Sequence, residues 1–526
     1  MAFQELLDQV GDLGKYQILQ MVLIFPTLMM LLCQIFLENF TAAIPGHRCW
    51  VNILDNDTVS DNDTEILSPD ALLRISIPMD SDLRPDKCHR FIHPQWQLLH
   101  VNGTFTNMTE PDKETCLDGW VYDQSSFPST IITEWDLVCS YQSQKSVVQF
   151  LFMTGMLVGG LIGGHLSDRF GRKLILRWCL LQLTIFGTSA AFAPTFLIYC
   201  LLCFLSGCAS VIILINGPLL IIEWIRPSSK VMAITLMSCA LSLGQMILGG
   251  LAFLFRGWRT LQLVVSVPFL VIFFSSRWLV EPARWLIINN KPEEGLKALR
   301  KVAHINGMKN AGDILTMEVS RKRKMVTYHQ LQHVGLESYG MHLSPFVHFR
   351  FATIVPFYGI TINLQHFGSN IFLFQVVFGA LTALVRCLPL LVQNHMGRRT
   401  TQTVFMFLVG LSILANTFVP QEMQTLRVAL ASAGISFAAA SSTSFSIHLI
   451  ELIPTVLRAT AMGILGLAGS IGAALAPLLM ILTIYSPHLP WIMYGAFPIL
   501  ACLVVLLLPE TRNQPLPDSI QDVEKE

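Results

Sequence analysis

Long apolar runs separated by short polar joints fill most of the chain. A helix that crosses the hydrocarbon core of a bilayer needs about 20 predominantly apolar residues. Twelve runs approach or exceed that length, and we expect each to be a membrane-spanning helix: 18–37, 146–166, 177–197, 199–222, 231–254, 262–280, 346–366, 370–393, 402–419, 425–450, 459–483 and 490–508. The first run has no small-residue cleavage site after it, so we interpret it as a helix and not as a removed signal peptide.

Polar segments divide these runs into two sets of six. We expect an all-α membrane protein with an N-terminal six-helix half at residues 1–280, which includes a long polar loop at residues 40–145. A central polar loop at 281–345 joins it to a C-terminal six-helix half at 346–508, and 509–526 form a tail. Repeated halves with a site between them are a common design of secondary transporters.

Composition agrees with this pattern. Only 13% of the 526 residues are charged, whereas a soluble protein carries about 25%. Most of the surface therefore does not face water. The formal net charge is zero, which gives no basis for nucleic-acid binding.

The polar loop at 40–145 combines cysteines with glycosylation triplets. It contains Cys49, Cys88, Cys116 and Cys139, and four cysteines allow three disulfide pairings. It also contains Asn-x-Ser/Thr triplets at Asn56, Asn62, Asn102 and Asn107. Disulfides and N-linked glycans both belong to oxidising, extracellular compartments, so we expect this loop to be extracellular and glycosylated.

Basic residues indicate which side of the membrane lies opposite this loop. Arg169 and Arg172 follow the second span, Arg398 and Arg399 follow the eighth, and Arg458 follows the tenth. All lie on the same side as the basic central loop, which the positive-inside rule makes cytoplasmic. Twelve spans then put both termini in the cytoplasm.

The two halves repeat a polar pattern at their helix ends. A Gly-x-x-x-Asp-Arg-x-Gly-Arg-Lys motif begins at Gly164, and Gly397-Arg398-Arg399 stands at the matching place of the second half. Gly164 suits close helix contact, Gly171 suits a turn, and acid–base pairs could latch one conformation. The predicted latch comprises Gly164, Asp168, Arg169, Gly171, Arg172, Glu223, Glu281, Arg284, Arg398, Glu451 and Arg458. The alternative is that the basic residues only anchor the topology.

This motif together with twelve spans resembles the major facilitator superfamily. The segments 38–45, 281–286, 451–458 and 508–511 resemble the organic anion/cation transporter family, solute carrier family 22, and most of all its organic anion branch. The resemblance implies a plasma-membrane carrier that works by alternating access. No nucleophile–base pair, cofactor motif or metal-ligand spacing suggests an enzyme.

Among the residues that the resemblance assigns to the family's central cavity, Arg386 matters most for the charge of the substrate. It interrupts the apolar run 370–393, where an isolated arginine costs at least about 2.5–3.5 kcal/mol. It matches a basic position of anion carriers, and a guanidinium can hold a sulfate or carboxylate through two hydrogen bonds. The alternative is a structural ion pair with an acid on another helix. The other positions that the resemblance assigns to the substrate site are Asn39, Phe357, Tyr358, Gln245, Leu241, Ser442 and Ser470.

The departures from the family narrow the expected substrate. Anion carriers of this family usually have an arginine where this chain has Ser470, and family aromatics correspond to Leu241 and Ser442. One cation and one aromatic pair favour bulky monovalent anions such as steroid sulfates over small dicarboxylates. No acid pair suits a proton relay, so we expect facilitated diffusion or anion exchange. A cation or zwitterion carrier, and a non-transporting protein that binds ligand or partner, remain as alternatives.

Residues 319–349 depart from the resemblance. His342, Pro345, His348 and Arg350 crowd the predicted start of the seventh span. We hypothesise an alternative exon or reading-frame product here, with a seventh span that is shortened or poorly inserted.

Overall fold

The computed structural model describes residues 14–56, 68–79, 84–96, 112–225, 227–289, 291–308, 336–367, 370–420, 422–452, 458–506 and 510. The chain divides into two compact units. We call Met1–Asn39, Ser146–Phe255 and Arg259–Glu526 the helical unit. We call Phe40–Lys145 with Arg256–Trp258 the disulfide-bonded unit.

Helices occupy all six predicted spans of the first half. They are α2 (Lys15–Ile35), α7 (Ser143–Phe170), α8 (Arg172–Ala190), α9 (Phe196–Ile222), α10 (Pro227–Leu254) and the pair α11 (Trp258–Ser266) and α12 (Pro268–Ser275). The break in the sixth span falls at Pro268, because proline lacks the N–H group that would continue the helical ladder. Two shorter helices, α13 (Ala283–Ile288) and α14 (Pro292–Ile305), follow.

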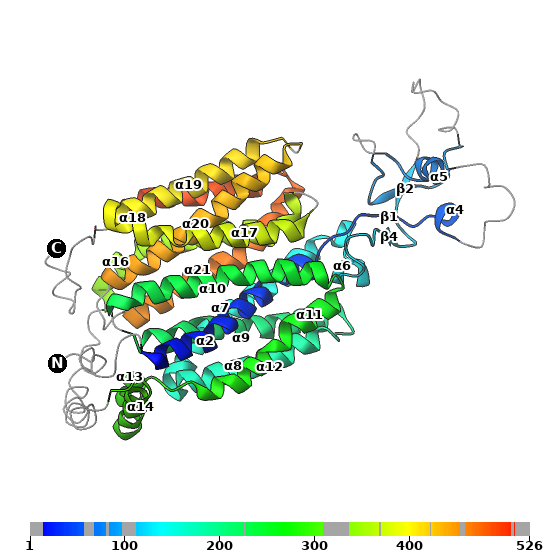
Figure 1. Ribbon diagram of the computed structural model, residues 1–526. Helices are drawn as coiled ribbons and strands as arrows, with labels where there is room; N and C mark the ends of the chain where they lie inside the picture. The colour runs from blue at the N-terminus through cyan, green and yellow to red at the C-terminus, as the bar shows by residue number, and fades with distance from the viewer. Residues whose placement is uncertain are drawn as a thin grey trace. The chain divides into compact units, whose positions relative to one another are not determined.

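The second half repeats this arrangement (Figure 1). Its helices are α16 (Leu336–Ile362), the pair α17 (Ile371–Val385) and α18 (Leu388–Met396), α19 (Arg398–Phe418), α20 (Gln424–Leu452), α21 (Arg458–Leu479) and α22 (Leu489–Val505). Single turns of 3-10 helix lie at η3 (Cys139–Tyr141), η4 (Ser276–Trp278), η6 (Leu364–His366) and η7 (Met480–Ile484). The predicted twelve-helix fold is confirmed.

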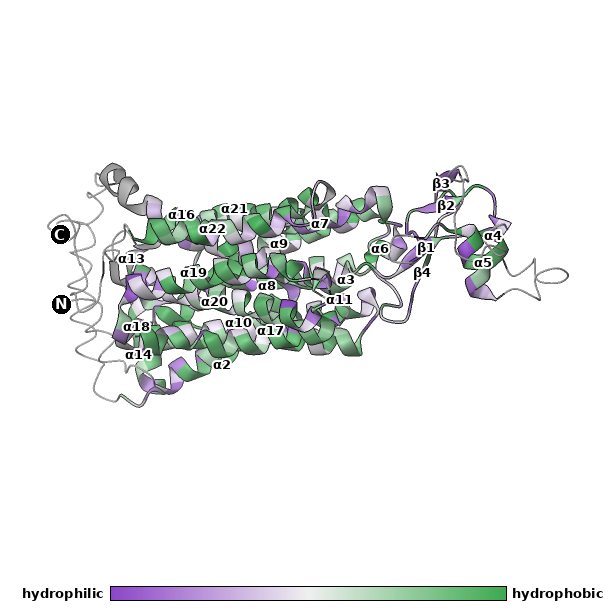
Figure 2. Cartoon of the chain, turned by 90° about the horizontal axis from the view of Figure 1, so that it is seen from above, coloured by the Kyte–Doolittle hydropathy of each residue, from purple (hydrophilic) through white to green (hydrophobic). Residues whose placement is uncertain are grey.

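The outer surfaces of these helices are apolar. Among the described residues, nine helices are long and apolar enough to cross a membrane, and α22 is shorter at 17 residues. Figure 2 shows hydrophobic colour over the helices of the helical unit. Leu197 is 79% exposed and Phe418 is 81% exposed. Such exposure of large apolar side chains is typical of a surface that faces lipid.

The seventh span is not shortened. Helix α16 begins at Leu336, before the predicted start at residue 346, and continues for 27 residues through Pro345 and Pro356. At 1.5 Å per residue this helix is about 40 Å long, enough to cross a bilayer. The expected shortening is therefore wrong. The hypothesis of an alternative exon concerns residues that lie mostly outside the described ones.

Glycines let α7 and α9 approach closely. A Cβ atom at Gly155 would lie 2.1 Å from the Phe204 carbonyl oxygen, and one at Gly207 would lie 2.2 Å from the Phe152 carbonyl oxygen. Backbones touch directly at such small-residue contacts. Gly164, to which we assigned this role, has no described atom within 4 Å of a Cβ built on it. The role belongs to Gly155 and Gly207 because they point between the helices.

Gly155→Val is expected to prevent folding of the helical unit. Its branched side chain would overlap the backbone of α9 and force the helices apart, which destabilises by about 1–3 kcal/mol or more. The yield of monodisperse protein on size-exclusion chromatography measures this effect. Gly164→Ala is the matched control and should behave as the wild type. A normal yield for Gly155→Val would contradict the packing described here.

The disulfide-bonded unit contains two small antiparallel sheets. Strand β1 (His47–Cys49) pairs with β4 (Trp120–Tyr122), and β2 (His89–Phe91) pairs with β3 (Lys113–Thr115). The short helices α3 (Glu38–Thr41), α4 (Asn52–Asp55), α5 (Pro69–Ser76) and α6 (Ile131–Glu134) lie in or beside this part of the sequence. The apolar pattern gave no sign of these strands.

The structure selects one of the three disulfide pairings. Cys49 is bonded to Cys116 and Cys88 to Cys139, so the links join the loop's first and last parts. Both links close long loops, which stabilises a small unit mainly by restricting its unfolded chain. Of the four predicted glycosylation sites, Asn56 is described and partly exposed. Asn62, Asn102 and Asn107 lie outside the described residues.

Candidate functional site

A carboxylate caps one helix in each half at matching positions. Glu281 accepts hydrogen bonds from the backbone N–H groups of Arg172 at 2.5 Å and Lys173 at 3.0 Å. Glu510 accepts them from Arg398 at 2.7 Å and Arg399 at 3.0 Å. Both carboxylates stabilise the positive end of a helix dipole.

A glycine with positive φ precedes each capped helix. Gly171 has φ +106° and Gly397 has φ +86°, a region that other residues rarely adopt. A Cβ atom at Gly171 would lie 3.2 Å from Glu281 Oε1, and one at Gly397 would lie 2.7 Å from Glu510 Oε2. The repeat seen in the sequence is therefore a repeated glycine–carboxylate cap.

The other latch residues fall into distinct settings. Arg172 donates to Glu223, and Asp168 is largely exposed with its carboxylate 4.0 Å from Arg172 Nη2. Arg169 lies over the Phe170 ring, and Arg284 is exposed. The side chains of Glu451 and Arg458 lie outside the described residues. Burial raises the pKa of Glu281, and the hydrogen bonds from Arg172 and Lys173 oppose that shift.

The Glu281 contact differs from the acid–base pairs that we expected at the helix ends, whereas Arg172 and Glu223 form one such pair. Glu281 reaches the backbone of α8 rather than a neighbouring arginine, because the end of the sixth span lies beside the start of the third. Each contact joins helices of the same half. In this conformation these pairs stabilise the halves rather than bridge them.

Glu281→Ala and Glu510→Ala are each expected to destabilise the protein by about 1–3 kcal/mol. Each change leaves two backbone N–H groups without their acceptor. Thermal unfolding of the detergent-solubilised protein is the measurement. Glu293→Ala, on the exposed face of α14, is the matched control. If only one of the two capping variants were destabilised, the symmetry of the caps would be refuted.

Several side chains on α16 face the interior of the helical bundle. Arg350 and Phe357 are seven residues apart, which places them on the same face about 10.5 Å apart along the axis. Tyr358 is buried beside them. The Phe36 ring contacts Phe357 at 6.3 Å and Tyr358 at 5.6 Å between centroids. The predicted aromatic pair therefore lies where the two halves meet and does not face lipid.

Arg386 lies where the eighth span is interrupted between α17 and α18. The side chain is only 9% exposed, and its Nε has no hydrogen-bond partner among the described residues. No carboxylate in the described part of the chain forms an ion pair with it. The alternative of a structural ion pair therefore has no support.

Arg350 is a second arginine within the helices of the second half, and the sequence analysis did not assign it to the site. Its Nη1 donates to Ser442 Oγ at 2.7 Å, and its guanidinium carbon lies 5.9 Å from the centroid of the Phe445 ring. A Cβ atom at Gly469 would lie 3.4 Å from its Nε. We attributed Arg350 to a disturbed helix start, although it interrupts an apolar run just as Arg386 does.

The other predicted site residues have separate environments. Asn39 donates from Nδ2 to the Thr361 carbonyl oxygen at 2.7 Å and so joins the two halves at the end of α16. Gln245 is fully buried on α10, with its Nε2 unbonded among the described residues. Leu241 and Ser470 are partly buried. Ser442 is the residue that bonds Arg350.

Comparison with known proteins decides the family. A family model described as Major Facilitator Superfamily matches residues 126–449. Solute carrier family 22 member 10 of Homo sapiens is 63% identical over 533 residues, which are 100% of this chain and 98% of that protein. The chain belongs to solute carrier family 22 of the major facilitator superfamily. It is thus a multi-pass membrane transporter and not an enzyme.

Further relatives of this solute carrier agree. A protein named Steroid transmembrane transporter SLC22A24, from Microcebus murinus, is 60% identical over 536 residues, covering 100% of this chain and 97% of that one. Among solved structures, the inward open conformation of the xylose transporter XylE from E. coli has a TM-score of 0.59. It covers 73% of this chain and 90% of its own, at 18% identity, and supports the fold alone.

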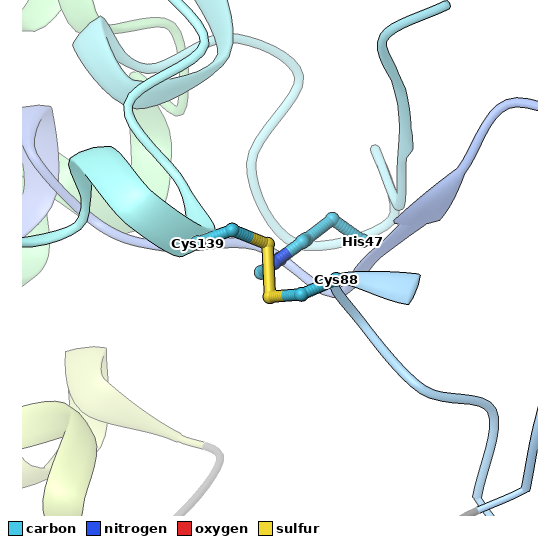
Figure 3. A group of neighbouring side chains, drawn as sticks. All are labelled: His47, Cys88 and Cys139. Carbon is cyan, nitrogen blue, oxygen red and sulfur yellow. A yellow bond between two sulfur atoms is a disulfide. The ribbon is translucent and has the colours of Figure 1, made fainter. Parts of the chain in front are cut away.

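One cluster of this solute carrier has the composition of a metal site. The ligand atoms of His47, Cys88 and Cys139 lie within 4.8 Å of one another (Figure 3). The two sulfur atoms are bonded to each other, so neither is a thiolate that could bind an ion. His47 Nδ1 lies 3.1 Å from the Pro45 carbonyl oxygen. The cluster is a covalent link with a histidine beside it.

Proposed function

We propose that this solute carrier transports amphipathic organic anions, such as sulfated or glucuronidated steroids, across the plasma membrane by alternating access. The supporting observation is the buried Arg386, which no carboxylate neutralises among the described residues. Residues 344–506 contain two acids, Glu422 in the α19–α20 joint and Glu451 at the end of α20. A buried cation without a partner is costly, and an anionic substrate supplies the missing charge.

An aromatic group where the two halves meet suits a substrate with a ring body. It consists of Phe36, Phe357 and Tyr358. Apolar burial stabilises by about 25 cal/mol per Å², so a steroid skeleton gains several kcal/mol there. Relatives that are 58–60% identical are named steroid transmembrane transporters, which supports a substrate with a steroid body.

A buried arginine also opposes a cationic substrate. The charge of Arg386 would repel an organic cation in a poorly solvated environment. We further propose that the disulfide-bonded unit is extracellular and that both termini are cytoplasmic. Facilitated diffusion or anion exchange is the proposed mode, because no acid pair for a proton relay accompanies Arg386 in the part of the chain that the structure describes.

Uptake by oocytes that express the full chain tests this function. We expect saturable uptake of labelled estrone sulfate that unlabelled steroid sulfates inhibit and tetraethylammonium does not. Surface biotinylation and glycosidase sensitivity confirm delivery to the plasma membrane. Inhibition by tetraethylammonium alone would indicate a cation carrier. Surface delivery without uptake of any conjugate would indicate a non-transporting protein.

A further inference from the structure

We propose that Lys173, Arg177 and Arg277 form a site that binds the headgroup of an anionic phospholipid. The site lies where the start of α8 contacts η4, at the end of the sixth span. This inference goes beyond substrate transport and rests only on the proposed orientation, which places this end of the helices at the cytoplasmic side. The cytoplasmic leaflet is the one that carries anionic lipids.

Contacts between α8 and the end of the sixth span bring the three cations together. Lys173 Nζ donates to the Arg277 carbonyl oxygen at 3.1 Å. Arg177 follows Lys173 by four residues, a spacing that puts their Cβ atoms about 5–6 Å apart on one side of the helix. The Arg177 guanidinium carbon lies 5.2 Å from the centroid of the Phe273 ring, four residues before Arg277. The three side chains therefore start from adjacent points of two packed elements.

These cations keep hydrogen-bond donors for a ligand. Among the described residues, none of the three forms an ion pair with a carboxylate. Glu281 lies beside Lys173, but it accepts from backbone N–H groups of α8. The Nε of Arg177 has no hydrogen-bond partner in the same part of the chain. Like charges four residues apart on a helix repel each other, and a phosphate group bound between them would remove that repulsion.

The second half shows that the packing of these elements does not require the cations. With the two glycine–carboxylate caps in register, the counterpart of Arg177 is Thr403 and that of Arg277 is Leu506. The Thr403 carbonyl oxygen accepts a hydrogen bond from Cys502 Sγ at 3.5 Å, so the matching elements are packed there as well. Neutral residues thus suffice for this contact. The arginines of the first half are therefore available for a separate role.

Exposed aromatic side chains beside the cations favour a lipid over a soluble anion. Trp178 is 58% exposed and Trp278 is 67% exposed, and each directly follows one of the two arginines in the chain. Phe274 on the same segment is 66% exposed. Tryptophan is enriched at the level of the lipid headgroups. Basic pockets between helices at that level on the cytoplasmic side bind anionic headgroups.

Native mass spectrometry of the full chain in detergent measures this binding. The probes are phosphatidylserine, phosphatidylcholine and the soluble headgroup glycerophosphoserine. For the wild type we expect phosphatidylserine to bind about tenfold more tightly than phosphatidylcholine and not to be displaced by glycerophosphoserine. The double variant Arg177→Thr with Arg277→Leu carries the residues of the second half. Its affinity for phosphatidylserine should fall about twentyfold, or about fivefold for each cation that is removed.

Two control variants separate charge from packing. Arg177→Lys with Arg277→Lys keeps both charges and should retain most of the preference for phosphatidylserine, which keeps the test decisive if the neutral double variant fails to fold. Lys297→Gln removes an exposed positive charge from α14 and should bind both phospholipids as the wild type does. Thermal unfolding without added lipid should be close to that of the wild type for the lysine variant and for Lys297→Gln.

Several results would overturn the inference. Equal binding of the two phospholipids by the wild type refutes the site, as does an unchanged affinity of the neutral double variant or a lost preference of the lysine variant. An equal loss in Lys297→Gln would show diffuse attraction to a basic surface. Displacement by glycerophosphoserine would identify a soluble anion as the ligand. None of these measurements uses uptake, so a failure of the proposed anion transport is recognised separately.

Discussion

Arg386→Gln is expected to remove saturable uptake of steroid sulfates while the protein still reaches the cell surface. Glutamine is shorter than arginine and keeps a polar amide, but it loses the charge that we propose to neutralise the substrate. Charged hydrogen bonds contribute about 1.5–3 kcal/mol, so the affinity should fall at least tenfold. Folding should not suffer, because the change removes a buried charge.

Uptake normalised to biotinylated surface protein is the measurement for this variant. Arg386→Lys is the informative companion, since lysine keeps the charge but cannot offer two parallel hydrogen bonds. It should retain weak uptake with a raised KM. Wild-type kinetics for Arg386→Gln, at normal surface expression, would show that this arginine does not hold the anion.

Oxidation of Cys239 and Cys387 is expected to stop transport by fastening the two halves together. The two sulfur atoms lie 3.8 Å apart, and a disulfide needs about 2.05 Å, so a small movement suffices. Cys239 lies on α10 of the first half and Cys387 between α17 and α18 of the second. Glycines bring these helices into close contact, as at Gly379, where a Cβ atom would lie 3.0 Å from the Ser242 carbonyl oxygen.

Copper phenanthroline is the oxidant for this test, accepting the two electrons as the thiols lose their protons. We expect uptake to fall by most of its value and to recover after mild reduction. Cys239→Ser and Cys387→Ser should each be insensitive to the oxidant, which also controls for effects on the two disulfides of the other unit. A cross-link proven by mass spectrometry without loss of uptake would show that α10 and α17 stay together during transport.

The helix-end acids illustrate what a sequence repeat can and cannot reveal. Glu281 and Glu510 each follow the last span of their half. Each carboxylate reaches backbone N–H groups that are more than 100 residues away in the chain, which the sequence pattern does not indicate. Matching spacing reports a repeated fold. It does not report which groups meet across that fold.

Arg386 and Arg350 also show what a sequence can and cannot reveal. Arg386 was found because a charge within an apolar run demands an explanation. Arg350 carries the same signal, but its run includes prolines and histidines, so we placed it at a helix end. The structure extends α16 ten residues earlier, to Leu336, and Arg350 then lies well inside the helix. Only the packing of α20 and α21 against it brings Ser442 and Gly469 to its side chain.

The sequence by itself determined the membrane-spanning class, the twelve helices, the two halves and the family. These follow from local properties: the length of apolar runs, the position of charges within them, and short motifs. The tertiary structure alone decided the disulfide pairing, the glycine–carboxylate caps, the contact between α10 and α17, and the contacts of Arg350 with Ser442 and Gly469. Such contacts join residues that are remote along the chain, so they depend on how the helices pack and not on the pattern of any one segment.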